Sequence, residues 1–209
     1  MSLQQPFNFF DSWHGLVENM FRFTMSLLEE DVGNTLKKKI LDIVDKYPKY
    51  MMDATSVRTF CHGDYRHANI MVREIDGQPS EVIPVDYQLL HYGCPVLDLI
   101  YFIFNGTDQE FRKNHLSHIK NVYFETMDDF LREFEINCVW TKEEFEQMFA
   151  EKLDFGLMIN VFYVPFTFAA EDDVPDVTGV LSEMSFKTDP RFKPRFRGVI
   201  EDFINWGYL

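Results

Sequence analysis

Apolar residues recur every three or four positions through the first fifty residues, and this spacing predicts amphipathic helices. The first helix is expected after an N-cap at Asp11 or Ser12, and its apolar positions are Leu16, Val17, Met20, Phe23, Leu27 and Leu28. The second is expected over 35–47, where Pro48 ends the pattern. Both helices would bury their apolar face and leave their charged residues in solvent.

The middle of the chain changes to short extended segments. Strands are expected over 57–61, 69–74 and 81–86, because these runs are rich in β-branched and other apolar residues. The residues at 76–80 form a turn cluster, which joins the last two strands into a β-hairpin.

The register of this hairpin decides which polar residues meet. A loop centred on 77–78 places Asn69 directly opposite Asp86. A two-residue turn at 76–77 would shift the register and bring Pro79, which has no N–H, into the ladder. Either register leaves Asn69 and Asp86 within about 7 Å of each other along the strands.

The rest of the chain is predicted to be helical. The segment at 93–95 precedes a helix over 96–105 that is apolar almost all round, as expected of a buried helix. Further helices are expected over 109–134, 141–153, 156–170 and 200–206. Thr141 and Glu144 have the spacing of a capping box. The acidic segment 171–176 is expected to be a solvated loop.

The composition narrows the class of protein. Of the 209 residues, 46% are hydrophobic, which is enough to bury a core and excludes global disorder. The 22 Phe, 9 Tyr and 10 Met favour an aromatic-rich core or, in part, an apolar ligand cavity. A net charge of −14 argues against nucleic acid or an anionic membrane surface as the main partner. This charge does not exclude a nucleotide that is held by a metal ion.

The cysteines and the N-terminus bear on the cellular compartment. Cys61, Cys94 and Cys138 are too few and too irregularly spaced for a disulfide framework or a zinc site. The first residues show no signal peptide, and no apolar stretch is long enough to span a bilayer. The protein is therefore expected to be cytoplasmic, without nucleic acid or membrane among its partners.

One polar segment is not required by packing. His62, Gly63 and Asp64 open a loop between two expected strands, and Asn69 follows at the end of that loop. Asp86 ends the strand that pairs with the strand of Asn69. Two oxygen ligands side by side, with a third carboxylate nearby, suit Mg²⁺ that carries bound phosphates. The sequence therefore predicts a magnesium–phosphate site.

These residues resemble the catalytic segments of the choline kinase and aminoglycoside phosphotransferase superfamily. Within it they are most similar to the ecdysteroid kinase-like (CHK kinase-like) family. The matching segments are Cys-His-Gly-Asp at 61–64, Asn-Ile-Met at 69–71, Val-Asp-Tyr-Gln at 85–88, Tyr-Gly-Cys-Pro-Val-Leu-Asp-Leu at 92–99 and Tyr-Phe-Ile-Phe at 101–104. The similarity is strong over 57–134 and weak over most of the remaining chain.

The resemblance implies a role for each candidate site residue. Asp64 would be the catalytic base or the residue that orients the attacking hydroxyl, while Asn69 and Asp86 would bind Mg²⁺ and, through it, ATP. His62 would support the loop. Asp98 would accept hydrogen bonds from the backbone of the loop and fix its shape; without the resemblance, it would be an ordinary acidic residue in the first turn of a helix.

The resemblance also implies the fold. The expected class is α+β and mostly helical: the C-terminal lobe of a protein-kinase-like fold, of the choline kinase type, with one small β-hairpin and no N-terminal lobe. The lobe would be a single domain over 1–209. Its parts would be connecting helices at 1–50, the catalytic loop, metal-binding hairpin and buried helix at 57–105, and a helical subdomain at 106–209. Neither a glycine-rich loop nor a strand lysine precedes Asp64.

The function implied is ATP- and Mg²⁺-dependent phosphorylation of a hydroxyl on a lipophilic, ecdysteroid-like small molecule. Arg66 departs from the family pattern, which often has Trp two residues after the catalytic Asp, and this bears on the acceptor side. The alternatives are a non-catalytic, pseudokinase-like binding module and a truncated gene product without its own function. Kinase-like folds host inactive members, so the motifs alone do not establish turnover.

The absence of an N-terminal lobe from these residues leads to two expectations. The surface that faces this lobe, near residues 7–13 and 70–83, would be uncovered, so the chain is expected to self-associate or bind a partner. ATP is expected to bind weakly, and residues 1–209 alone are expected to show no phosphotransfer.

Overall fold

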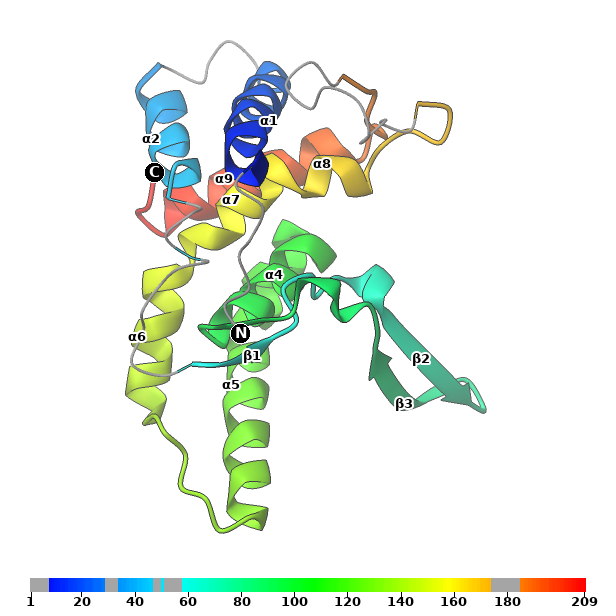
Figure 1. Cartoon of the computed structure of the whole chain (residues 1–209), viewed down its shortest axis with the longest axis vertical. Coiled ribbons are helices and arrows are strands. Elements are labelled where there is room, and N and C mark those ends of the chain that lie inside the picture. The colour runs from blue at the N-terminus through cyan, green and yellow to red at the C-terminus, as the bar shows by residue number, and fades with distance from the viewer. Residues whose placement is uncertain (1–7, 29–33, 47–49, 51–57, 174–184) are drawn as a thin grey trace. The chain divides into compact units, whose positions relative to one another are not determined.

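The computed structural model describes residues 8–28, 34–46, 50, 58–173 and 185–209 (Figure 1). Helices and a few short antiparallel strands give a mostly helical α+β fold, which confirms the predicted class. The chain divides into two compact units, Met1–Asp45 with Leu157–Leu209, and Lys46–Gly156. The single kinase-like lobe expected over 1–209 stays a prediction. In the part of the chain that the structure describes, no helix is long and apolar enough to cross a membrane.

The first unit is helical. Its elements are α1 (Asn8–Ser26), α2 (Asn34–Val44), most of α7 (Asp154–Phe162), α8 (Val164–Thr167) and α9 (Phe192–Asn205). Leu16 and Met20 on α1 and Ile40 and Val44 on α2 are buried, as the periodicity predicts. Pro48, which was expected to end the second helix, lies outside the described residues.

Two C-terminal helices differ from the prediction. The helix expected over 156–170 is divided into α7 and α8, because Pro165 has no N–H to continue the hydrogen-bond ladder. The helix expected over 200–206 begins earlier, at Phe192. Pro194 lies in the first turn of α9, where the N–H groups have no partner within the helix in any case.

The segment after α8 is partly described. Glu171 and Asp172 are exposed in a turn, as expected for this acidic segment, and an isolated bridge joins Ala169 to Thr188. The remainder of the expected acidic loop, at 174–176, lies outside the described residues.

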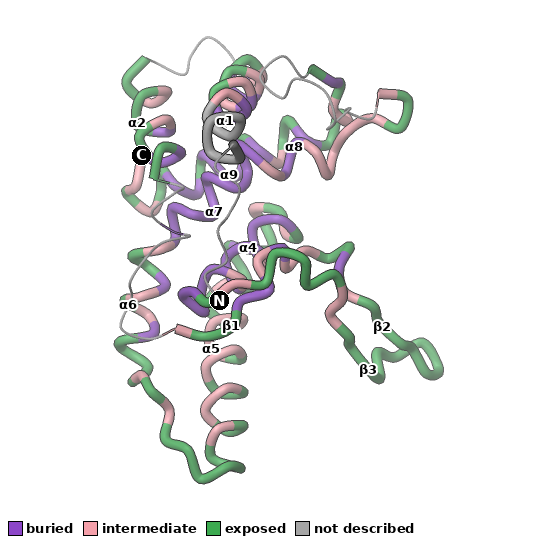
Figure 2. Tube along the Cα trace, viewed as in Figure 1, coloured by how far each residue is buried: buried purple, intermediate pink, exposed green. Residues whose placement is uncertain are grey.

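The second unit carries the predicted site. Its elements are β1 (Thr59–Cys61), β2 (Ile70–Ile75), β3 (Gln78–Pro84), β4 (His91–Gly93), α4 (Val96–Gly106), α5 (Gln109–Glu133) and α6 (Lys142–Lys152). Helix α4 is largely buried, as its all-round apolar sequence predicts (Figure 2). The capping box of α6 is present: Glu144 N donates to Thr141 Oγ1 at 3.2 Å, and Thr141 N donates to Glu144 Oε2 at 2.7 Å.

A second pair of strands was not predicted. β1 and β4 pair antiparallel, with Thr59 opposite Gly93 and Cys61 opposite His91. Each strand has three residues, which is too short for an alternating pattern to show in the sequence. The pairing brings the segment that follows β1 close to the start of α4, and so places the loop at 62–69 beside that helix.

The predicted register of the hairpin is wrong. Ile70 lies opposite Pro84, so Asn69 and Asp86 are not partners in the ladder. The tight turn at 76–77 is the one that forms. Both turn residues have the positive φ that a two-residue hairpin turn needs, 52° and 74°. Pro79 does enter the ladder, and an irregularity of the pairing next to it accommodates the residue that cannot donate.

Candidate active site

The loop at 62–69 is held at its start by one carboxylate. His62 N donates to Asp98 Oδ2 at 2.6 Å, and Gly63 N donates to Asp98 Oδ1 at 3.0 Å. Asp98 lies in the first turn of α4, so a buried helix fixes the backbone of the loop. Gly63 has a φ of 81°, and a Cβ there would overlap the carbonyl oxygen of Leu89. Only glycine fits this position.

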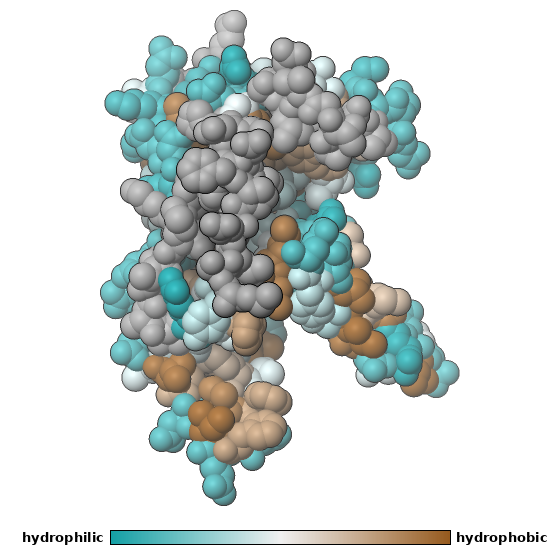
Figure 3. All heavy atoms as spheres, viewed as in Figure 1, coloured by the Kyte–Doolittle hydropathy of each residue, from teal (hydrophilic) through white to brown (hydrophobic). Residues whose placement is uncertain are grey.

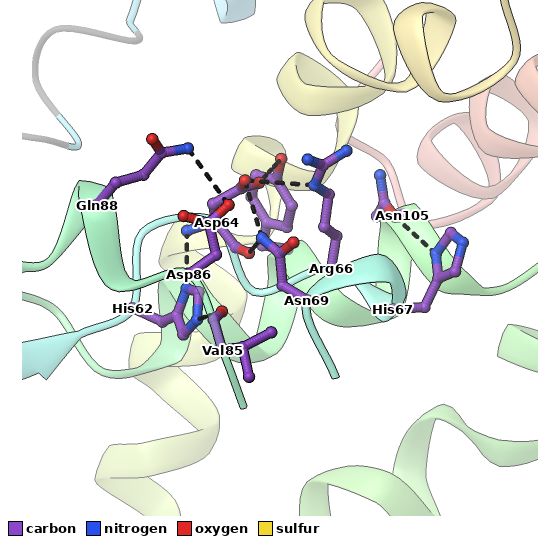
Figure 4. Close-up of polar contacts among 10 residues, drawn as sticks. His62, Asp64, Arg66, His67, Asn69, Val85, Asp86, Gln88 and Asn105 are labelled. Carbon is purple, nitrogen blue, oxygen red and sulfur yellow. Dashed lines mark hydrogen bonds and ion pairs between the residues drawn. The ribbon is translucent and has the colours of Figure 1, made fainter. Parts of the chain in front are cut away.

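Asp64 is buried, and both oxygens of its carboxylate have partners. Tyr101 Oη donates to Oδ1 at 2.9 Å, and Asn69 Nδ2 donates to Oδ2 at 3.0 Å. Arg66 Nε lies 3.2 Å from the same Oδ2 (Figure 4). These contacts come from the loop and from α4, and they hold the carboxylate in one orientation.

Asn69 links the loop to the hairpin. Its Nδ2 also donates to the carbonyl oxygen of Asp64 at 2.9 Å, and its own carbonyl accepts from Val85 N at 2.8 Å. Because both amide hydrogens are directed at Asp64, the side-chain Oδ1 remains for a ligand. The bond to Val85 brings the next residue, Asp86, beside Asn69. The predicted proximity of Asn69 and Asp86 is therefore present, although they are not a cross-strand pair.

Asp86 is exposed and has an unusual backbone conformation. Its φ of 68° and ψ of 59° lie in the left-handed region, which residues other than glycine seldom occupy. Gln88 Nε2 lies 3.4 Å from Asp86 Oδ2. Aspartate enters this region more often than most side chains do, and here the conformation leaves the carboxylate exposed.

His62 braces the loop against the end of the hairpin. Its Nε2 lies 2.9 Å from the carbonyl oxygen of Val85, and its Nδ1 accepts from Asp64 N at 3.4 Å. This pair of contacts requires the neutral ring with its hydrogen on Nε2, because a backbone carbonyl only accepts. The ring also packs on Tyr87, with centroids 4.5 Å apart. These contacts are those of a supporting residue.

The surroundings of the loop favour neutral groups. Burial, with smaller contributions from Asp98 and Cys94, raises the pKa of Cys61 to about 12. Burial, followed by Tyr87 and Asp98, also raises the pKa of Tyr65. Both side chains therefore stay protonated at neutral pH.

The donor set at Asn69 and Asp86 fits Mg²⁺ bound together with phosphates. It offers one exposed carboxylate and one amide oxygen, and Mg²⁺ in phosphate-transfer sites takes few protein ligands beside phosphate oxygens and water. No group of three or more His, Cys, Asp or Glu that could hold a metal ion occurs among the described residues. A metal ion at this site would therefore depend on its phosphate ligands.

Two contacts of the site were missed by the sequence analysis. Tyr101 was known only as part of a motif, yet it donates directly to Asp64. It follows Asp98 by three residues, and this spacing on a helix puts both side chains on one face and could have revealed it. Arg66 was noted as a departure, but its approach to Asp64 depends on the folded shape of the loop, which no sequence pattern shows.

One comparison with known proteins gives a match, and it spans this part of the chain. A model of the ecdysteroid kinase-like family matches residues 4–136, which is 133 of the 209 residues. The match includes the loop, the hairpin, α4 and α5. No curated protein and no solved structure matches the chain.

Proposed function

Because this chain belongs to the ecdysteroid kinase-like family, we propose that it serves the ATP- and Mg²⁺-dependent transfer of a phosphoryl group to a hydroxyl of a small molecule. The family supports a small-molecule kinase-like function in general. The ecdysteroid-like, lipophilic acceptor and the identity of residues 1–209 as a kinase-like C-terminal lobe are further parts of the proposal. The observation that carries it is that Asn69 bonds Asp64 through its side-chain amide and Val85, the residue before Asp86, through its backbone carbonyl.

Asp64 would act on the acceptor. Its carboxylate would orient the hydroxyl and accept its proton as the oxygen bonds to the γ-phosphorus of ATP and the bond from that phosphorus to ADP breaks. Tyr101 and Asn69 would keep the carboxylate oriented throughout. Asp98 would act at one remove, by holding the backbone on which Asp64 stands.

Asn69 and Asp86 would hold Mg²⁺ through Oδ1 and a carboxylate oxygen. The ion would supply positive charge that neutralises the phosphate oxygens and so favours the developing transition state. His62 would keep the two ligands together, because its ring joins the loop to the carbonyl of Val85 next to Asp86.

A non-catalytic binding module remains the second candidate, because one observation favours it. Asp64 accepts hydrogen bonds from Tyr101 and Asn69, and Arg66 Nε lies 3.2 Å from its Oδ2. The two protein hydrogen bonds engage both carboxylate oxygens, so a substrate hydroxyl would have to share an oxygen with a protein donor. Such a site would hold magnesium and nucleotide without turnover.

Binding of Mn²⁺–ATP tests the metal assignment. Mn²⁺ replaces Mg²⁺ and is followed by electron paramagnetic resonance with the full chain. Asp86→Asn is expected to weaken the binding by about tenfold or more, because a charged ligand is lost. Asp76→Asn is the matched control: Asp76 also has a positive φ and lies on the same hairpin, but in its distal turn. Equal affinity of wild type and Asp86→Asn would refute the metal site.

Asp64→Asn separates binding from chemistry. In a chain completed with an N-terminal lobe, it is expected to retain Mn²⁺–ATP binding and to lower phosphoryl transfer from γ-labelled ATP by about 10²–10⁴-fold, as for a lost general base. A completed wild-type chain that binds Mn²⁺–ATP through Asp86 and still transfers no phosphoryl group to any alcohol would support the binding module instead.

A further inference from the structure

Arg66 places a cation directly against the proposed catalytic base. Its Nε is buried and lies 3.2 Å from Asp64 Oδ2, but without the alignment of a hydrogen bond. A third of the Arg66 side chain is exposed, 34%, against 11% for Asp64. Within the described part of the chain, the terminal nitrogens of its guanidinium have no hydrogen-bond or ion-pair partner. The guanidinium is therefore held beside Asp64, while its two terminal nitrogens are available to bind a ligand.

The position of Arg66 distinguishes two sides of Asp64. Figure 4 shows Arg66 on one side of the Asp64 carboxylate, and Asp86 with Gln88 on the other. If Asp86 binds the metal ion and the nucleotide phosphates, as the proposed function holds, Arg66 lies on the side that faces the acceptor.

A free guanidinium fork has a definite ligand chemistry. It binds carboxylate, sulfate or phosphate through two parallel hydrogen bonds, and a neutral alcohol cannot replace them. A neutral alcohol that approached Asp64 would compete with Arg66 for Oδ2 and leave the guanidinium unsatisfied. An acceptor with its own anionic group would occupy the guanidinium, and its hydroxyl could then reach Oδ2. The chain carries a net charge of −14, so an anion needs such a local cation to bind.

We propose that Arg66 determines acceptor specificity, and that the acceptor is a lipophilic alcohol that carries an anionic group close to the hydroxyl to be phosphorylated. This inference rests on the proposed function, because that function defines the acceptor side. It narrows the substrate class from alcohols in general to acidic conjugates, such as a sulfate, phosphate or carboxylate of the parent alcohol.

Binding of a minimal acidic alcohol tests the proposal. The full chain is titrated with glycerol 3-phosphate and with glycerol, and the dissociation constants are measured by nuclear magnetic resonance. We expect wild type to bind glycerol 3-phosphate at least about tenfold more tightly than glycerol, and Arg66→Gln to lose this preference. Arg66→Lys keeps the charge without the fork and is expected to be intermediate.

Arg73→Gln is the matched control. Arg73 also pairs with a carboxylate, Glu81, at 2.7 Å, but it lies on the exposed hairpin away from Asp64. This variant should bind glycerol 3-phosphate as wild type does. A melting curve of each variant shows that it is folded, and Arg66→Lys provides the comparison should Arg66→Gln not fold. The proposal is overturned if wild type shows no preference for glycerol 3-phosphate, or if Arg66→Gln and Arg66→Lys both keep it.

A second arm decides whether the anion belongs to the acceptor or to the nucleotide. The titration is repeated with saturating Mg²⁺ and β,γ-methylene ATP, and undiminished glycerol 3-phosphate binding is expected. Competition would assign Arg66 to the nucleotide phosphates and overturn the proposal. Asp86→Asn is expected to weaken the binding of the nucleotide and to leave the binding of glycerol 3-phosphate unchanged. If Asp86→Asn leaves nucleotide binding unchanged, the assignment of Asp86 to the metal ion is wrong. If only the Arg66 variants fail to behave as expected, that assignment still stands.

Discussion

In the loop at 62–69 the polar residues His62, Asp64 and Asn69 are buried, whereas in the hairpin of β2 and β3 apolar side chains are exposed (Figures 2 and 3). Asp64 is 8% exposed and each of its carboxylate oxygens has a partner. Met71 and Ile75 on the hairpin are 62% and 60% exposed. Hydrogen bonds to buried groups therefore fix the loop, while the hairpin is fixed chiefly by its own ladder.

This difference matters for Asp86, which ends the exposed hairpin. An isolated two-stranded ribbon is only marginally stable in water. Two contacts at its base, from Val85 N to Asn69 and from His62 to Val85, tie Asp86 to the rigid loop. The geometry of the proposed metal site therefore depends on these contacts and not on the distal part of the hairpin.

The largest expected effect concerns the reactivity of the cysteine beside the loop. Cys61 directly precedes the loop, and a pKa raised from 9.0 to about 12 lowers its thiolate fraction near pH 8 by about a thousandfold. Iodoacetamide should therefore modify the partly exposed Cys138 in the native chain and leave Cys61 unmodified, as judged by mass spectrometry. In urea all three cysteines should react. Raising the pH to 9 should still leave Cys61 unreactive; rapid native alkylation of Cys61 would show that the loop opens.

The next largest effect is expected at Asp98. Asp98→Ala removes the acceptor of His62 N and Gly63 N, and should lower the free energy of unfolding by about 2–4 kcal/mol, since an unsatisfied buried donor costs about 1–3 kcal/mol. Urea titration of the purified chain measures this loss.

Asp108→Ala serves as its control. The Asp108 side chain accepts from Phe111 N at 2.8 Å and caps α5 at an exposed position. Loss of such a cap costs about 1 kcal/mol. If Asp98→Ala is no more destabilising than Asp108→Ala, the loop does not depend on Asp98. The contrast between a loop fixed by buried hydrogen bonds and an exposed hairpin would then be wrong.

The smallest effect on stability is expected on the hairpin. Met71 and Ile83 are a cross-strand pair, and both side chains are largely exposed. Changing both to Ser should alter the free energy of unfolding by less than about 0.5 kcal/mol per site, as for other surface positions. Light scattering should show less self-association of the double variant than of wild type. A large loss of stability would mean that these side chains are buried in solution.

Local signals in the sequence were sufficient for many elements. The capping box at Thr141 and Glu144 depends on residues three apart, and the periodicity over 109–134 extends through one long helix. The spacing of Asp64, Asn69 and Asp86 also predicted that these residues would meet, because the loop and the hairpin that join them are short.

The features that the sequence did not reveal depend on distant or irregular geometry. Tyr101 reaches Asp64 across 37 residues, and only the fold determines that distance. The register was wrong because the favourable turn at 76–77 prevailed over the unfavourable Pro79, with an irregularity of the ladder absorbing the conflict. The pairing of β1 with β4 could not be predicted, since three residues carry no recognisable alternation.

The left-handed backbone of Asp86 has a consequence for how this protein can change. Most residues with a side chain are about 1–2 kcal/mol less favourable in that region than glycine; aspartate tolerates it better than most, yet glycine is still the more favourable residue there. A laboratory library screened for heat resistance or expression yield would therefore tend to lose the aspartate at this position. Lineages that no longer needed the chemistry would be expected to drift the same way. The residue at position 86 is thus a readable record of whether a descendant sequence has been kept for its activity or only for its fold.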